Sequence, residues 1–162
     1  MNKIKIEVKW AFIFIGSLLL WMVLERLAGL HDEHIDKHQY LTMLYAIVAI
    51  ALYVFALLDK RKNYYNGVMT YKQGFIAGLI ITVIVTLFSP LTQWIISTII
   101  TPDYFKNVIE YSVKVGYHKS IADAEAQFNL SNYIIQSTVW ALLMGIITTA
   151  IVAAFTKKKS TN

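Results

Sequence analysis

The chain has no cysteine among its 162 residues, and only two prolines and seven glycines. Without cysteine it cannot form a disulfide, use a thiolate nucleophile or hold zinc through sulfur. It also has no linker rich in glycine, serine or proline, no low-complexity tract and no repeat of solenoid period. We therefore expect a single domain over residues 1–162, with no room for a separate soluble catalytic domain.

Charged residues are also scarce, at 15% of the chain, whereas apolar residues make up 57%, above the roughly 45–50% of a typical soluble domain. No charged residue occurs in four stretches: residues 10–24, 39–58, 73–102 and 126–156. A helix needs about 20 apolar residues to cross the hydrocarbon of a bilayer, so three stretches are long enough and the first becomes so with its flanks. The sequence therefore predicts an all-α polytopic protein with four transmembrane helices, surrounded by membrane lipids. These helices fall near residues 10–29, 40–58, 74–101 and 133–156.

The formal net charge of +5 is unevenly distributed along the chain. The N-terminal segment, the 59–72 loop and the 157–159 tail carry ten positive and two negative charges, or +8, while the other two connecting segments sum to −3. Excess Lys and Arg near span ends marks the cytoplasmic side, so we expect both termini in the cytoplasm. The basic clusters are interpreted as topology signals that touch anionic lipid, and no nucleic-acid partner is predicted.

Three histidines lie close together between the first two spans, in a segment rich in Asp and Glu. On a helix His31, His34 and His38 would share a face, which suits two or three imidazole ligands to a divalent metal such as Zn²⁺. The segment lacks the HExxH pattern of zinc proteases. A solvated loop or a pH-responsive segment accounts for the same residues, so the metal site is one of three open interpretations.

Glu25 and Arg26 lie about one turn before the end of the first span. Neighbours in sequence do not face each other on a helix, so the two side chains cannot form a simple pair. In one interpretation both reach the interface, because long charged side chains extend toward water. In the other, Glu25 is a buried carboxylate on a proton or cation path, since ionisable groups inside membranes mark functional sites.

Spans three and four carry small and polar residues at intervals of three or four, which place them on one helix face. In span three these are Gly74, Gly78, Thr82, Thr86, Ser89, Gln93, Ser97 and Thr101, and in span four Ser137, Ala141, Gly145, Thr149 and Ala153. Small residues let membrane helices approach closely, so we expect the two faces to meet. The alternative is a polar path between the helices, lined by Thr86, Gln93, Asn132 and Gln136. Pro90 is expected to kink span three, with Ser89 and Thr86 placed to satisfy the freed carbonyl.

The segment from residue 102 to 131 is predicted to form two amphipathic helices outside the membrane. Thr101-Pro102-Asp103 has the pattern of an N-cap followed by proline at the first helical position, and Gly116 can end that helix. Ser120 with Asp123 has the pattern of a capping box for a second short helix. Such helices bury their apolar faces in the interface, cap a bundle or dock a partner.

Several segments together resemble a known family: residues 30–35 (LHDEHI), 57–62 (LLDKRK) and 67–75 (GVMTYKQGF), with Ser89-Pro90-Leu91-Thr92 and the 102–128 insert. They are similar to those of small four-span bacterial membrane proteins catalogued as domain of unknown function 4199. The resemblance covers nearly the whole chain and implies a bacterial inner-membrane protein. It brings no activity, substrate or catalytic residue.

Three functional hypotheses follow from these residues. The leading one is a non-enzymatic subunit, scaffold or sensor of the cell envelope that binds itself or other envelope proteins. The second is a small transporter or channel that uses the polar residues of the spans: Glu25, Thr82, Thr86, Ser89, Gln93 and Gln136. The third is a metal-dependent envelope enzyme built on His31, His34 and His38. No catalytic residue is assigned.

Overall fold

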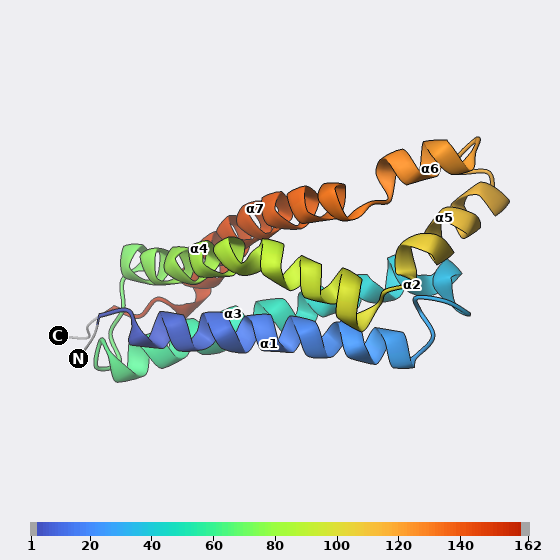
Figure 1. The fold of residues 1–162 in the computed structure, drawn as a ribbon. Helices are drawn as coiled ribbons and strands as arrows, with labels where there is room; N and C mark the ends of the chain where they lie inside the picture. Colours follow the sequence, from blue (N-terminus) through green and yellow to red (C-terminus); the bar gives the residue numbers. More distant parts are fainter. Residues whose placement is uncertain (1–2, 160–162) are drawn as a thin grey trace. The chain divides into compact units, whose positions relative to one another are not determined.

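The computed structural model describes residues 3–159 and builds them almost entirely from helices (Figure 1). The α-helices are α1 (Lys5–Leu27), α2 (Ile35–Leu41), α3 (Tyr45–Asn63), α4 (Tyr71–Ile95), α5 (Tyr104–Lys114), α6 (Ile121–Gln127) and α7 (Leu130–Thr156). A 3₁₀ turn, Thr42–Leu44, joins α2 to α3, and a π-helical turn, Ile96–Ile100, extends α4. Within residues 3–159 there is no β-strand, and one isolated bridge pairs Met69 with Lys158.

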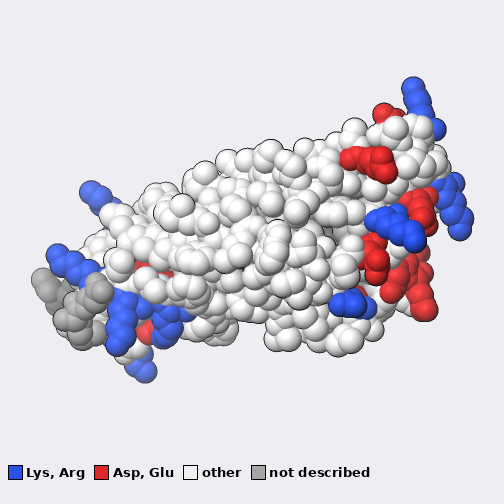
Figure 2. Space-filling model, viewed as in Figure 1, with Lys and Arg blue, Asp and Glu red and all other residues white. Residues whose placement is uncertain are grey.

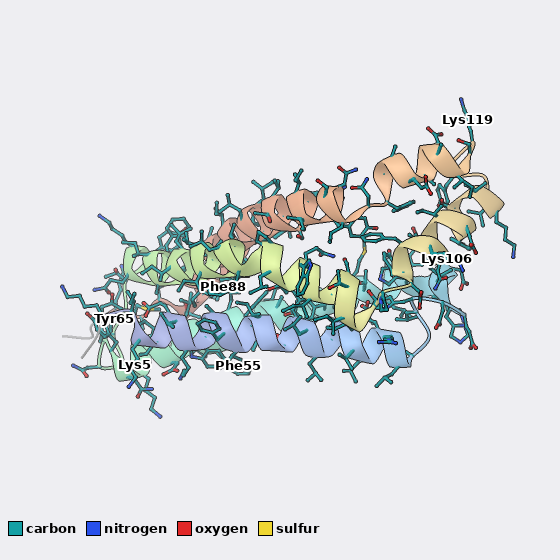
Figure 3. All side chains as sticks on the ribbon, viewed as in Figure 1. Lys5, Phe55, Tyr65, Phe88, Lys106 and Lys119 are labelled. Atoms are coloured by element: carbon teal, nitrogen blue, oxygen red, sulfur yellow. The ribbon has the colours of Figure 1, made fainter. Side chains whose placement is uncertain are left out.

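Four helical stretches are long and apolar enough to cross a membrane, which confirms the predicted fold class. They are Lys5–Leu27, Ile35–Asn63, Tyr71–Ile100 and Ile121–Thr156. The short helices α5 and α6 lie between α4 and α7, as expected, and the fourth apolar stretch takes in α6 together with α7. Large apolar side chains such as Leu87, Phe155 and Phe55 are 72%, 83% and 56% exposed, and Phe55 lies on the outside of the ribbon (Figure 3). Hydrocarbon, rather than water, suits such a surface.

The chain forms two compact units. One, here the termini unit, comprises residues 3–16, 46–88 and 139–159; the other, here the insert unit, comprises residues 17–45 and 89–138. Helices α1, α4 and α7 contribute residues to both. The termini unit has ten Lys or Arg and two acidic residues, or +8, and the insert unit has five and eight, or −3. Figure 2 shows mainly positive side chains on the termini unit and side chains of both signs on the insert unit.

In the termini unit, α4 and α7 approach each other through small residues. A Cβ atom added at Gly78 would lie 2.5 Å from Cγ2 of Thr149, and one added at Gly145 would lie 2.4 Å from Cγ2 of Thr82. Each glycine therefore packs directly against the threonine side chain of the opposite helix. Thr82 also bonds the Tyr53 hydroxyl of α3 at 2.8 Å. This is the close packing that lets membrane helices associate without a hydrophobic driving force.

A buried ion pair joins α1 to α3 in the same unit. Lys60 is 3% exposed and Glu7 is 2% exposed, and the Lys60 ammonium lies 2.8 Å from one Glu7 oxygen and 3.0 Å from the other. The same ammonium donates to the Lys3 carbonyl at 2.5 Å and lies 3.7 Å from the ring centroid of Tyr64. A buried charge needs such partners, because removing one of them leaves the other without compensation.

The sequence predicts three helix ends in the insert unit, at Gly116, Ser120 and Thr101, and the structure has the first two. Gly116 has φ of +80° and ends α5, and Ser120 accepts a hydrogen bond from the Asp123 backbone N–H at 3.2 Å at the start of α6. The predicted cap at Thr101 is wrong. Its hydroxyl donates to the Ile96 carbonyl at 3.1 Å and closes the π-helical turn, so α5 begins only at Tyr104.

Candidate metal centre

Glu25 is the centre of a buried polar cluster in the insert unit. It lies in the last two turns of α1 and is 3% exposed. The Trp21 indole N–H donates to Oε1 of Glu25 at 2.5 Å, from one turn earlier in the same helix. The other oxygen, Oε2, lies 3.2 Å from Nε2 of His31 and 3.4 Å from Nε2 of His38. One carboxylate oxygen therefore faces two imidazoles.

A glycine turn brings His31 to this position. Gly29 has φ of +73°, and the N–H groups of Gly29 and Leu30 bond the carbonyls of Arg26 and Glu25 at 3.0 Å each. These two bonds form a Schellman motif, in which a left-handed glycine ends a helix. The chain folds back immediately afterwards, so His31 is buried at 4% exposure over the end of α1.

The three histidines do not share a helix face, in contrast to the spacing argument. Helix α2 begins only at Ile35, after the glycine turn, so His31 and His34 precede it and His38 lies within it. His34 is exposed, with its ring beside Gly29. His31 and His38 come together with Glu25 instead, and their potential ligand atoms lie within 4.8 Å of one another.

Arg26 turns away from the cluster, as the non-facing geometry of neighbouring helix residues requires. It is exposed, and its guanidinium donates to the Ile100 carbonyl at 2.5 Å. Carbonyls at the end of a helix lack intrahelical partners, and Ile100 ends the π-helical turn. Of the two adjacent charges, Glu25 is thus the buried one.

Helix α5 reaches the cluster through Tyr104 and Asn107. The Tyr104 hydroxyl lies 3.4 Å from Nδ1 of His38 and 3.4 Å from the Tyr133 hydroxyl, and the Asn107 amide donates to the His31 carbonyl at 2.9 Å. Burial, and then the neighbouring Tyr133 and Glu25, raise the pKa of Tyr104. Its phenol therefore stays protonated and is available for hydrogen bonding to an imidazole.

In the part of the chain that the structure describes, two ring nitrogens of the cluster lack a hydrogen-bond partner, and one of them faces Glu25. Nε2 of His38 and Nδ1 of His31 are buried and have no hydrogen-bond partner within the described residues. Nε2 of His31 makes a hydrogen bond of 3.2 Å with Oε2 of Glu25, at the long end of the normal range, whereas Nε2 of His38 lies 3.4 Å from the same oxygen. A cation placed between these atoms would give Nε2 of His38 the partner that it lacks among residues 3–159.

A partly open pocket of about 560 Å³ adjoins the cluster, with His38 and Tyr104 in its wall. Its other lining residues come from α2, α5, α6, α7 and the turns between them, and include His118 in the turn after α5 and Gln127 at the end of α6. Nε2 of His118 bonds the Gln127 side-chain oxygen at 3.2 Å. The lining is mainly aromatic and polar without Lys or Arg, so the pocket gives the cluster a route to the surface.

The remaining polar candidates fall in both units. Thr82 lies in the packed contact of the termini unit with a 0% exposed side chain, and the Thr86 hydroxyl there is buried without a partner among the described residues. In the insert unit Ser89 bonds Ser137 at 3.3 Å and Gln93 bonds Ser97 at 2.9 Å. Gln136 is exposed.

The packing candidates not yet placed are Gly74 and Ala141. A Cβ atom at Gly74 would lie 3.1 Å from the Met69 methyl and 3.4 Å from Cβ of Ala153, so Gly74 continues the close contact of α4 with α7. Ala141 is half-buried. Sequence reasoning did not connect Glu25 with the histidines, although Gly29 between them is a signal for a reversal of the chain. Tyr104 carries no such local signal, because its contact with His38 is long-range.

Comparison with known proteins identifies one family. The model of the family described as "Protein of unknown function (DUF4199)" matches residues 9–158. No curated protein and no solved structure matches the chain significantly.

Proposed function

The chain belongs to this DUF4199 family, and we propose that it is a non-enzymatic sensor of the cell envelope. In this proposal it is a multi-pass protein of the bacterial inner membrane, with both termini in the cytoplasm. A divalent metal ion held by Glu25, His31 and His38 on the outer side is its signal. The division of charge into a termini unit of +8 and an insert unit of −3 supports this orientation, because Lys and Arg concentrate on the cytoplasmic side.

The observation that carries the proposal is that one buried carboxylate joins three separate segments. Glu25 belongs to α1, His31 to the turn after it and His38 to α2. Tyr104 adds α5 through His38. An uncompensated buried charge is strongly destabilising. The presence or absence of a cation at this point therefore changes how firmly α2 and α5 are held to the end of α1.

A change in the insert unit has a covalent route into the rest of the chain. Helices α1, α4 and α7 are continuous and contribute residues to both units. A ligand shifts an equilibrium only by its different affinity for the two states, and a cation bound between three segments has that property, because it binds only where they meet. The receiver of the signal in this proposal is another envelope protein or a second copy of the chain.

The absence of cysteine allows a direct test with spin labels. Lys37 on α2 and Lys106 on α5 are exposed, and Lys106 projects away from its helix (Figure 3). We expect the distance distribution between labels at Lys37→Cys and Lys106→Cys, in lipid nanodiscs, to narrow when a divalent cation replaces EDTA. Mg²⁺, Ca²⁺, Mn²⁺ and Zn²⁺ are added one at a time.

The matched variants separate the cluster from general charge effects. Glu25→Gln should abolish the narrowing, because the amide cannot balance a cation, whereas Glu33→Gln, the same change at an exposed carboxylate, should keep it. A distribution that is unchanged by all four cations would refute the sensor function.

A further inference from the structure

The donor atoms of the cluster specify the kind of cation, and we infer that the insert unit is a binding site for Zn²⁺ or a transition-metal ion of the same ligand preference. The ligands are a Glu25 carboxylate oxygen and Nε2 of His31 and His38. This inference rests on the proposed function only for the role of the ion as a signal. The site itself follows from the contacts of Glu25, His31 and His38.

The ligand set excludes the hard cations. Ca²⁺ takes six to eight oxygen ligands, and Mg²⁺ requires octahedral oxygen coordination. The cluster offers one carboxylate and two imidazoles. Two histidines and one glutamate form a known zinc ligand set that leaves a fourth position open, and imidazole also suits Cu, Fe and Ni.

Two of the three distances between the donor atoms match one shared ion, and all three donor atoms lie within 4.8 Å of one another. Two ligands that each lie about 2.0–2.1 Å from a tetrahedral zinc are about 3.3 Å apart. Oε2 of Glu25 lies 3.2 Å from Nε2 of His31 and 3.4 Å from Nε2 of His38. The Trp21 N–H occupies the other oxygen of Glu25, so the carboxylate would bind the ion through Oε2 alone.

Tyr104 is the positioning residue for His38. A metal-bound histidine usually donates its other ring N–H to an oxygen, which fixes the tautomer. Nδ1 of His38 lies 3.4 Å from the Tyr104 hydroxyl, and with its proton on Nδ1 the ring turns a lone pair on Nε2 toward the carboxylate. Two lone pairs facing each other repel unless a cation lies between them. This repulsion explains why the buried Nε2 of His38 has no hydrogen-bond partner within residues 3–159.

The fourth position is reached from the adjoining pocket. His38 and Tyr104 line its wall, and its volume of about 560 Å³ is ample for water, which completes the coordination of zinc sites with three protein ligands.

The binding experiment uses the full chain, purified without a histidine tag and stripped of metal in lipid nanodiscs. Calorimetric titration with Zn²⁺ should give one ion per chain, and Mg²⁺ and Ca²⁺ should give no binding. Co²⁺ in the same site should show the intense visible absorption of tetrahedral coordination. Zinc that binds no more tightly than Mg²⁺, or an octahedral Co²⁺ spectrum, would overturn the inference.

The variants use the chain's own histidines as controls. His38→Ala and Glu25→Gln each remove a ligand and should therefore weaken zinc binding by more than the roughly 10- to 100-fold that the loss of a ligand's hydrogen-bond partner costs. His34→Ala should leave binding unchanged, because His34 is exposed and outside the cluster. Circular dichroism establishes that each variant is folded, and the near-isosteric Glu25→Gln serves if His38→Ala does not fold. Equal losses in His34→Ala and His38→Ala would contradict the assignment.

Tyr104→Phe tests positioning separately from ligation. It should weaken zinc binding about 10- to 100-fold and shift the Co²⁺ absorption, whereas a purely structural role would leave the spectrum of the bound ion unchanged.

The two proposals fail independently. If Zn²⁺ binds as described but the distance between labels on α2 and α5 does not change, the metal site stands and the sensor function is wrong. If another divalent cation changes that distance and Zn²⁺ does not bind, the sensor function stands and the zinc assignment is wrong.

Discussion

Replacing Gly145 by alanine should destabilise the contact between α4 and α7 by about 2 kcal/mol. The added Cβ atom would lie 2.4 Å from Cγ2 of Thr82, which is 1.0 Å inside the 3.4 Å edge of ordinary contact. Thr82 cannot easily move aside, because its side chain is 0% exposed and its hydroxyl bonds Tyr53 at 2.8 Å. Overpacking of this kind costs about 1–3 kcal/mol, and the better helix propensity of alanine offsets about 1 kcal/mol. An overpacking cost of about 3 kcal/mol, the upper end of that range, therefore leaves a net destabilisation of about 2 kcal/mol.

The assay is reversible unfolding in mixed micelles, followed by circular dichroism. Gly16→Ala is the matched control, because Gly16 is also a helical glycine in a spanning stretch but has nothing within 4 Å of an added Cβ atom. That variant should be neutral or slightly stabilising. Combining Gly145→Ala with Thr82→Ala should recover part of the loss, since it removes the Cγ2 atom that clashes. A Gly145→Ala protein as stable as the Gly16→Ala protein would refute the close contact.

Three further predictions concern charge, ionisation and topology. Lys60→Met should destabilise the protein by about 3–5 kcal/mol because it leaves the Glu7 carboxylate buried without its partner, and adding Glu7→Gln should recover most of this free energy of unfolding. Burial raises the pKa of Tyr104 above 10.0, so the folded state holds this proton more tightly than the unfolded state does. The contribution of this group to the free energy of unfolding is therefore complete below pH 10.0 and is lost as the pH rises above it. Tyr104→Phe should therefore leave the phenolate absorbance of the folded protein near pH 10.0 unchanged; a loss of one titrating group would contradict the burial. In intact spheroplasts a membrane-impermeant maleimide should label Lys106→Cys and not Lys157→Cys, and the reverse pattern would invert the topology.

In the candidate site, some contacts follow from local sequence signals and others depend on long-range packing. Gly29 ends α1 and reverses the chain, which is a local effect that glycine in the left-handed region commonly produces. The pairing of Glu25 with His31 follows from that reversal. The choice of His38 over His34 depends on where α2 begins, and helix starts without a side-chain cap have weak sequence signals.

The sequence by itself determined the four long apolar helices, the position of the insert between the last two, and the cap at Ser120. Each depends on neighbouring residues alone: the length of an apolar run, the order of segments and a hydrogen bond across three residues. Only the tertiary structure decided that Gly145 receives Thr82 and that Lys60 pairs with Glu7. It also decided that the Tyr104 hydroxyl lies beside Nδ1 of His38, whose other ring nitrogen faces Glu25. These contacts join residues far apart in the chain, and periodicity shows which face of a helix is special but not which partner it meets.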